Sequence, residues 1–275
     1  ESNTRRVSKE PSETQIAQKT HEHFVKEYLS SKIFFYNATD ATKIPLRQKP
    51  VKVEKEKPQA KKRGRPKKGE TREPIKPTIL KQQKELLSVE EKLALVSTEC
   101  GVGIKQNSKG NREVWIGGKL HISAVDGDIP VTAFYSGANI HDSSIALPLI
   151  QETSKRVNYL YDLQDAGYDA DIIREFSNKL GHRPIIDTNP KNSKELKAKI
   201  ELIEHENKTF KYLNWHLNCD EQHYKQRSMV ERVNKYLKDD FGCDKIYYQG
   251  ATKVASVLAF GILSICIHKS LQLVT

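Results

Sequence analysis

The sequence has few cysteines and no apolar run that we expect to cross a bilayer. Its four cysteines show neither a C-x-x-C pair nor zinc-ligand spacing, so we expect reduced thiols in an intracellular, cytoplasmic protein. No basic segment followed by an apolar one opens the chain, which gives secretion no support. The apolar run 254–267 is shorter than the roughly 20 residues of a membrane span, which favours a buried helix. Because the chain begins at Glu1 without a methionine, we expect a fragment that lacks an upstream segment.

Acidic residues are too few to balance the basic ones. Among 275 residues there are 46 Lys and Arg against 35 Asp and Glu, a net charge of +11. This excess favours an anionic partner, with nucleic acid ahead of an acidic membrane surface. The length is sufficient for one sizeable hydrophobic core with an appended segment.

Most of the excess charge lies in one segment, 41–80. It holds fourteen Lys and Arg against four Glu, and six of the eleven prolines. A segment of this composition cannot bury enough apolar surface to fold alone, so we predict a solvated, disordered insertion. The chain then divides into an N-terminal helix and first core strand at 1–43, a basic Pro-rich loop at 44–82, and the rest of the core at 83–275.

Within this loop, the sequence Arg63-Gly64-Arg65-Pro66 is similar to an AT-hook. The flat, narrow backbone of that motif lets Arg63 and Arg65 lie along the minor groove of A·T-rich DNA, where the negative potential is deepest. The alternative is a basic linker that contacts phosphates without reading bases. Both interpretations make DNA the expected partner.

Hydrophobic patterning in the rest of the chain predicts alternating strands and helices. We expect strands at 33–36, 158–163 and 183–187, and a hairpin at 114–125 and 129–135 with Asp126-Gly127 between them. Helices are expected at 12–30 (opened by a capping box at Ser12), 89–96, from 143 onward, 169–180 (capped by Asp169), 191–208, 224–238 and 251–273. This order is compatible with an α/β fold in which helices flank a mixed sheet. An acid that follows strand 33–36 would lie at the sheet edge, where active sites of open α/β sheets collect.

Four side chains recur at helical spacing toward the C-terminus. Tyr224, Arg227, Glu231 and Lys238 are separated by three, four and seven residues, which keeps them on one stripe of a helix. A neighbouring stripe is apolar and would pack on the core: Val230, Val233, Leu237 and Phe241. The same spacing also fits a solvated helix face with ion pairs, such as one between Arg227 and Glu231.

The pattern Y-x2-R-x3-E-x6-K formed by these four residues resembles the signature of DDE transposases of bacterial insertion sequences. The resemblance covers the chain from about Phe34 onward, including 118–121, 138–143 and 184–190. It implies a ribonuclease-H-like core. In this family the first catalytic aspartate has a D-x-T context and the second a D-x-G-Y-D context. These contexts correspond to Asp40 and Asp165, and Glu231 would be the third catalytic acid.

Phosphodiester chemistry explains why three acids would converge. Two Mg²⁺ (or Mn²⁺) ions about 3.5–4 Å apart activate the nucleophile and relieve charge on the leaving oxygen, and magnesium prefers carboxylate and water oxygens. Without metal the acids repel one another, so at least one should resist ionisation. Arg227 and Lys238 would bind phosphates as a planar fork and a point charge, and Tyr224 would stack on a base or bond a phosphate.

Other acids compete for the catalytic roles. Asp126 and Asp128 belong to the predicted hairpin turn, and Asp142 is expected to cap a helix. Asp162 is the rival of Asp165, but the period-two alternation of strand side chains turns it away.

Three further positions bear on this interpretation. His121 and His141 are expected to be structural. Where relatives often carry Cys-Asp-Val-Gly, this chain has Cys100-Gly101-Val102-Gly103. If that aspartate were essential, this copy would be catalytically impaired.

The resemblance implies a transposase that acts as a homodimer on paired element ends and joins them to target DNA in the bacterial nucleoid. A truncated, non-catalytic DNA-binding remnant is the main alternative. A general ribonuclease-H-like nuclease is a third, and it would cut without regard to terminal repeats. Binding of phosphates predicts an affinity that falls steeply with salt.

Overall fold

The computed structural model describes residues 15–51, 77–106, 110–190, 193–209, 219–244 and 246–272. The predicted capping box at Ser12 lies outside these residues. So does the centre of the basic loop, with Arg63 and Arg65.

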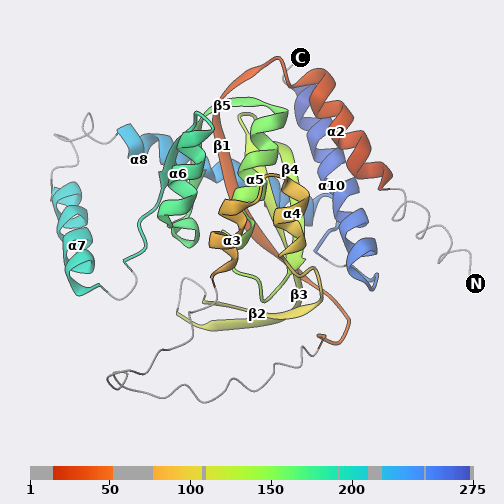
Figure 1. The fold of residues 1–275 in the computed structure, drawn as a ribbon, viewed down its shortest axis with the longest axis horizontal. Coiled ribbons are helices and arrows are strands. Elements are labelled where there is room, and N and C mark those ends of the chain that lie inside the picture. Colours follow the sequence, from red (N-terminus) through yellow and green to blue (C-terminus); the bar gives the residue numbers. More distant parts are fainter. Residues whose placement is uncertain are drawn as a thin grey trace, which may run out of the picture.

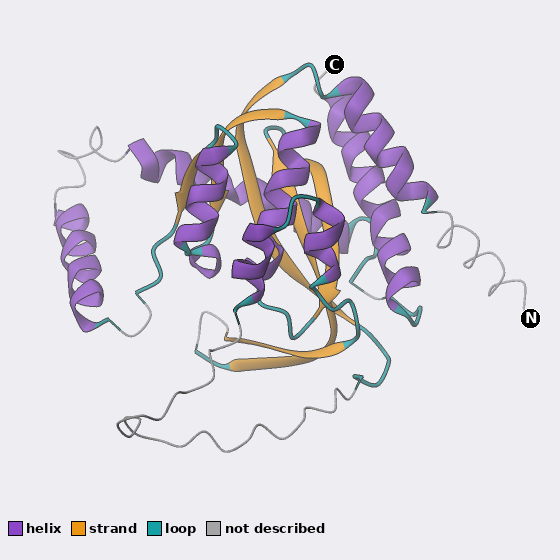
Figure 2. Ribbon diagram, viewed as in Figure 1, coloured by secondary structure: helices purple, strands orange, loops and turns teal. Residues whose placement is uncertain are grey.

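One mixed sheet lies at the centre of the described chain (Figures 1 and 2). Its strands are β1 (Ile33–Pro45), β2 (Gly101–Gln106), β3 (Arg112–Val125), β4 (Ile129–Gly137), β5 (Asn158–Gln164) and β6 (Arg183–Ile186). β1 pairs antiparallel with β3 and parallel with β5. β3 also pairs antiparallel with β2 and β4, and β6 adds in parallel to β5. The predicted α/β class is confirmed, and the arrangement is compatible with a ribonuclease-H-like core.

Helices cover both faces of the sheet. They are α2 (Ile16–Tyr28), α3 (Ile79–Glu85), α4 (Val89–Ala94), α5 (Ser143–Arg156), α6 (Asp171–Lys179), α7 (Lys194–Thr209), α8 (Cys219–Tyr224), α9 (Ser228–Asp239) and α10 (Ala251–Gln272). One face carries α5 and α6, with α3 and α4 packed on α5. The other carries α9 and α10, and α2 lies along α10 (Figure 1).

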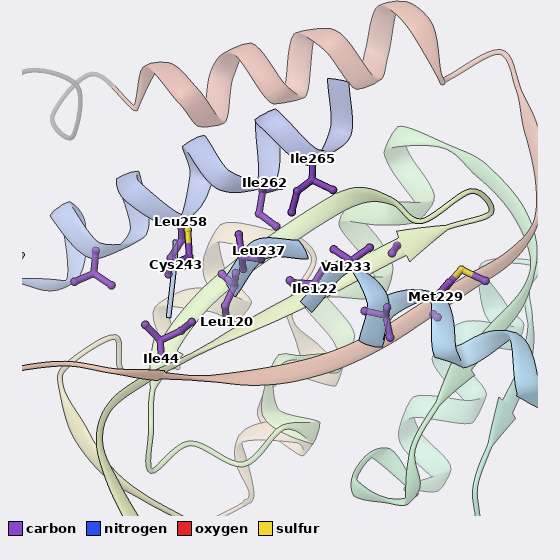
Figure 3. Packing of buried hydrophobic residues seen from close by; sticks show 14 of the residues in the cluster. Ile44, Leu120, Ile122, Met229, Val233, Leu237, Cys243, Leu258, Ile262 and Ile265 are labelled. Atoms are coloured by element: carbon purple, nitrogen blue, oxygen red, sulfur yellow. The ribbon is translucent and has the colours of Figure 1, made fainter. Parts of the chain in front are cut away.

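The main hydrophobic core lies between the sheet and the pair α9–α10. Figure 3 shows Val233 and Leu237 of α9 directed toward Leu120 and Ile122 of β3, with Ile262 of α10 beside them. Among the described helices, α10 alone has the length and mean hydropathy (1.8) of a membrane span. Val254, Leu258, Ile262 and Ile265 pack in this core, but only 39% of the apolar window is buried, so the predicted buried helix is buried on one face.

β1 is longer than predicted. We expected the strand to end near Tyr36, with Asp40 at its end, but it continues to Pro45. Residues 41–45, assigned to the solvated loop, remain paired with β3, and Ile44 is fully buried. Basic composition predicts a loop here, whereas a strand with one buried face can carry basic residues such as Lys43 on its exposed surface.

The predicted single helix at 224–238 is also wrong in detail. The chain forms α8, then a 3-10 turn η2 (Lys225–Arg227), then α9. Phe241, expected on the buried stripe, lies beyond the end of α9 and is exposed. The predicted hairpin is present, with Gly127 and Asp128 both at positive φ in the turn.

Candidate active site

Two of the predicted catalytic acids lie on neighbouring strands at the end of the parallel part of the sheet. In the β1–β5 ladder the last pair joins Thr39 to Gln164, and Asp40 and Asp165 follow these residues directly. β1 continues against β3, with Asp40 opposite Ile122. The two aspartates therefore lie where β5 leaves the sheet, on the side covered by α9.

The environment of Asp40 disfavours its charged form. Burial, together with the negative charge of Asp165, raises the pKa of Asp40 to about 6, against opposing effects from the Ala41 N–H, Arg227 and other cations. The Nδ2 of Asn234 in α9 donates a hydrogen bond to Asp40 Oδ2 at 2.9 Å. An acid pair in which one member resists ionisation matches the expectation for a cation site without its metal.

A tight turn presents Asp165. Ala166–Tyr168 forms the 3-10 turn η1, and the N–H of Gly167 donates to Asp165 Oδ1 at 2.9 Å. A Cβ at Gly167 would lie 2.9 Å from the same oxygen, so the glycine of D-x-G leaves room for the carboxylate. Tyr168 is buried against α5 and α6 and anchors the turn. Burial raises the pKa of Asp165, and the Gly167 N–H counteracts it.

The third predicted acid, Glu231, forms an ion pair with Arg227. The distance from Arg227 Nη2 to Glu231 Oε1 is 2.5 Å, so the ion pair expected from helical spacing is present. The guanidinium also lies over the Tyr224 ring, 5.7 Å from its centroid. Burial opposes the charge of Arg227, but Tyr224 and the three acids outweigh burial and raise its pKa. Arg227 is therefore a positive charge shared by all three predicted acids.

Lys238 lies near Asp40, and two lysines that sequence reasoning missed, Lys43 and Lys105, act on Lys238. Burial and the charge of Lys43 lower the pKa of Lys238, and Lys105 of β2 acts in the same direction. Lys105 also acts on both aspartates. Lys105 and Lys238 thus bring positive charge to this end of the sheet, which suits phosphate, whereas Lys43 is paired with Glu113. No spacing in the sequence connects these lysines, because they converge only through strand pairing and the packing of α9 on the sheet.

Asp162, the rival of Asp165, lies on the opposite face of the sheet. It is fully buried and accepts hydrogen bonds from Ser177 Oγ and Asn37 Nδ2, each at 3.0 Å. Burial raises its pKa to about 6. Its contacts are those of a structural carboxyl group.

The other competing acids bind cations or backbone groups. Asp126 Oδ2 accepts the N–H of Phe35 at 2.5 Å. Asp128 binds Arg232 through two oxygens, with Nη2 to Oδ1 at 2.6 Å and Nε to Oδ2 at 2.8 Å. These contacts tie the hairpin turn to β1 and to the helix that carries Glu231.

Two predicted helix caps differ from expectation. Asp142 holds the N-cap position of α5, but its carboxylate makes no capping bond and pairs with Lys119 at 2.8 Å. The N-cap of α6 is Ala170 rather than Asp169. Asp169 instead pairs with Arg174 at 3.0 Å.

His121, His141 and Gly101, the glycine at the position where relatives often carry an aspartate, lie in ordinary structural environments. His121 is buried, its Nε2 lies 2.8 Å from Ser136 Oγ, and burial lowers its pKa to about 4. His141 is exposed and bonds Ser143 at the start of α5. Gly101 lies in β2, where a Cβ would meet Asn139 Oδ1 at 2.4 Å, so an aspartate there would require Asn139 to move.

The donor set fits a divalent cation in part. No group of three or more metal-capable side chains gathers anywhere in the described residues, and Glu231 is paired with Arg227. Asp40 and Asp165, however, form an adjacent carboxylate pair whose repulsion a cation would relieve. Two acids that could donate oxygen ligands are thus adjacent. The third, Glu231, is paired with Arg227.

A comparison with protein families gives one match. The family model described as "Transposase DDE domain" matches residues 37–267, which include every described residue of the candidate site. No curated protein matches the chain.

Proposed function

Because the chain belongs to the family of transposase DDE domains, we propose that it cuts the ends of an insertion sequence and joins the freed 3′-hydroxyls to target DNA. The carrying observation is the acid pair Asp40 and Asp165, with raised pKa values on adjacent strands. Arg227, which precedes the helix covering the pair, acts on both aspartates and forms an ion pair with Glu231 of that helix. A transposition function follows from the family. The roles of the individual acids, Arg227, Lys238 and Tyr224 are part of the proposal.

Asp40, Asp165 and Glu231 would hold two Mg²⁺ or Mn²⁺ ions, which activate the attacking oxygen and stabilise the leaving one. Arg227 binds a phosphate through its planar guanidinium group. The phosphate then replaces Glu231 as the partner of Arg227. Lys238 contributes a point charge to the neighbouring phosphate. Tyr224, already beneath the guanidinium, stacks on a base or bonds a phosphate near the cut.

The remaining predictions belong to the same proposal. Arg63 and Arg65 of the loop 44–82 enter the minor groove of DNA, while 1–43 and 83–275 form the catalytic core. Two copies act on paired ends, in the bacterial cytoplasm at the nucleoid. A net charge of +11 supports an anionic substrate of this kind.

A cleavage assay tests the proposal directly. The full chain is incubated with Mg²⁺ and a duplex that carries the terminal repeat of its element, beside a duplex with the repeat scrambled. We expect nicking at the repeat end, and its loss to background in Glu231→Gln and Asp165→Asn. Glu175→Gln is the matched control, because Glu175 is exposed and pairs with Lys84 away from the acids. Wild-type nicking by Glu231→Gln would overturn the assignment.

The second candidate function is a non-catalytic DNA-binding remnant, which the departure at Gly101 favours. Such a protein would bind the duplex in a salt-dependent manner and leave it intact in both Mg²⁺ and Mn²⁺. Equal cutting of the scrambled duplex would instead indicate a general nuclease.

A further inference from the structure

Asn234 is the one polar residue among the buried residues of α9. The others are Met229, Val230, Val233 and Leu237. An amide on a packed helix face costs free energy unless it is hydrogen-bonded. Asn234 is 8% exposed, and its Nδ2 donates to Asp40 Oδ2 at 2.9 Å. The only described partner of this buried amide nitrogen is thus an acid of the candidate site, 194 positions away in the sequence.

We propose that Asn234 is a positioning residue for divalent metal binding, which holds the Asp40 carboxylate in a fixed orientation by its Oδ2 oxygen. This inference depends on the proposed function, in which Asp40 is a metal ligand. Outer partners of this kind orient metal-binding carboxylates, and their loss typically lowers metal affinity about 10- to 100-fold.

The chemistry of the amide suits this role. An N–H donor stabilises the charged form of a carboxylate, which is the form that binds a cation. A lysine or arginine at position 234 would donate equally well, but its charge would repel the metal ions. A second carboxylate there would add to the repulsion between Asp40 and Asp165. A neutral donor avoids both effects.

The packing of α9 gives the contact its rigidity. Val233 and Leu237, on either side of Asn234, are fully buried against the sheet. Arg232, two residues before Asn234, ties the helix to Asp128 of the hairpin turn. The helix is therefore held in place both before and after Asn234, and this fixes the position of the amide relative to Asp40.

The same sheet provides a matched control. Asn37 Nδ2 donates to Asp162 Oδ1 at 3.0 Å on the opposite face, and both residues are fully buried. This pair has the same donor, the same acceptor and nearly the same length as Asn234–Asp40. It lies outside the acid cluster, so its loss should affect folding without affecting metal.

The test measures Mn²⁺ binding to the full chain by calorimetry, without DNA. We compare wild type, Asn234→Ala, Asn37→Ala and Asp40→Asn. We expect Asn234→Ala to weaken Mn²⁺ binding about 10- to 100-fold, Asn37→Ala to bind like wild type, and Asp40→Asn to lose binding. In the cleavage assay, raised Mn²⁺ should restore Asn234→Ala but not Asp40→Asn.

The outcomes separate the two proposals. Wild-type affinity in Asn234→Ala, with binding lost in Asp40→Asn, overturns the role of Asn234 and leaves the metal site standing. Wild-type affinity in Asp40→Asn overturns the metal site itself, and the role of Asn234 with it. Equal weakening in Asn234→Ala and Asn37→Ala would mean a general effect on folding and also overturns the role. If Asn234→Ala does not fold, Asn234→Ser is measured against the same criteria.

Discussion

Asp40 and Asp162 occupy opposite faces of one sheet and have much in common. Each has a pKa raised to about 6. Each accepts a hydrogen bond from an asparagine, Asn234 at 2.9 Å for Asp40 and Asn37 at 3.0 Å for Asp162. By pKa or by hydrogen bonding alone, either carboxyl group could be taken for a catalytic one.

Their neighbours differ. The donors to Asp162 are all uncharged: Ser177, Asn37 and Gln164. Its raised pKa comes from burial. Asp40 has a second acid beside it, and Arg227 acts on both acids. Burial is the main cause of the raised pKa in both groups, and the difference is that a second acid, Asp165, adds to it only at Asp40.

The largest expected effect is on catalysis, where matched Asp→Asn substitutions should separate the two groups. Asp40→Asn removes a proposed metal ligand, so DNA cleavage should fall by about three orders of magnitude, equivalent to about 4 kcal/mol in the barrier. Asp162→Asn should keep cleavage within several-fold of wild type. Single-turnover rates on the repeat duplex measure both. A similar loss in the two variants would contradict a catalytic role for Asp40 and a structural role for Asp162.

A smaller effect should appear in the pH dependence of stability. Because the folded pKa of Asp162 lies above the unfolded value of 3.8, its stabilising contribution is present below that value and is lost as pH rises to about 6. Between pH 4 and 7 the loss is about 2 kcal/mol. The difference in free energy of unfolding between wild type and Asp162→Asn should therefore shift by that amount, in favour of the variant at pH 7. Urea titrations at the two pH values measure it, and a constant difference would contradict the burial argument.

The smallest expected change in stability follows from Arg227→Gln. The ion pair with Glu231 is about half exposed on the glutamate side, so its loss should change the free energy of unfolding by less than about 1 kcal/mol. The salt dependence of DNA binding should nevertheless weaken by about one phosphate contact. Fluorescence anisotropy at several salt concentrations gives the slope. An unchanged slope would remove Arg227 from the proposed phosphate contacts.

The sequence was a good guide wherever local chemistry determines structure. The turn formed at Asp126-Gly127 as expected because Gly127 adopts positive φ without steric cost, although the second residue at positive φ is Asp128 rather than Asp126. In the D-x-G-Y-D segment, the glycine leaves room for Asp165 and the tyrosine is buried. The spacing of Arg227 and Glu231 correctly predicted their contact, since i,i+4 neighbours meet on any helix.

Contacts between distant segments could not be predicted. The full length of β1 depends on β3, which pairs with it about 80 positions later. Asn234 and Lys105 carry no recognisable motif, and their relation to Asp40 exists only after strands and helices have packed. The AT-hook-like arginines and the domain division remain predictions.

The pairing of β1 with a strand on each side limits how this strand can move. Sliding this strand would break hydrogen bonds to β3 and to β5 at once, so the ladder fixes the backbone of Thr39 and Gln164, the residues that Asp40 and Asp165 directly follow. Glu231 lies on α9, outside this ladder, and is held by the ion pair with Arg227. A movement of α9 relative to the sheet would therefore change the distance from Glu231 to the two aspartates without changing the spacing of β1 and β5.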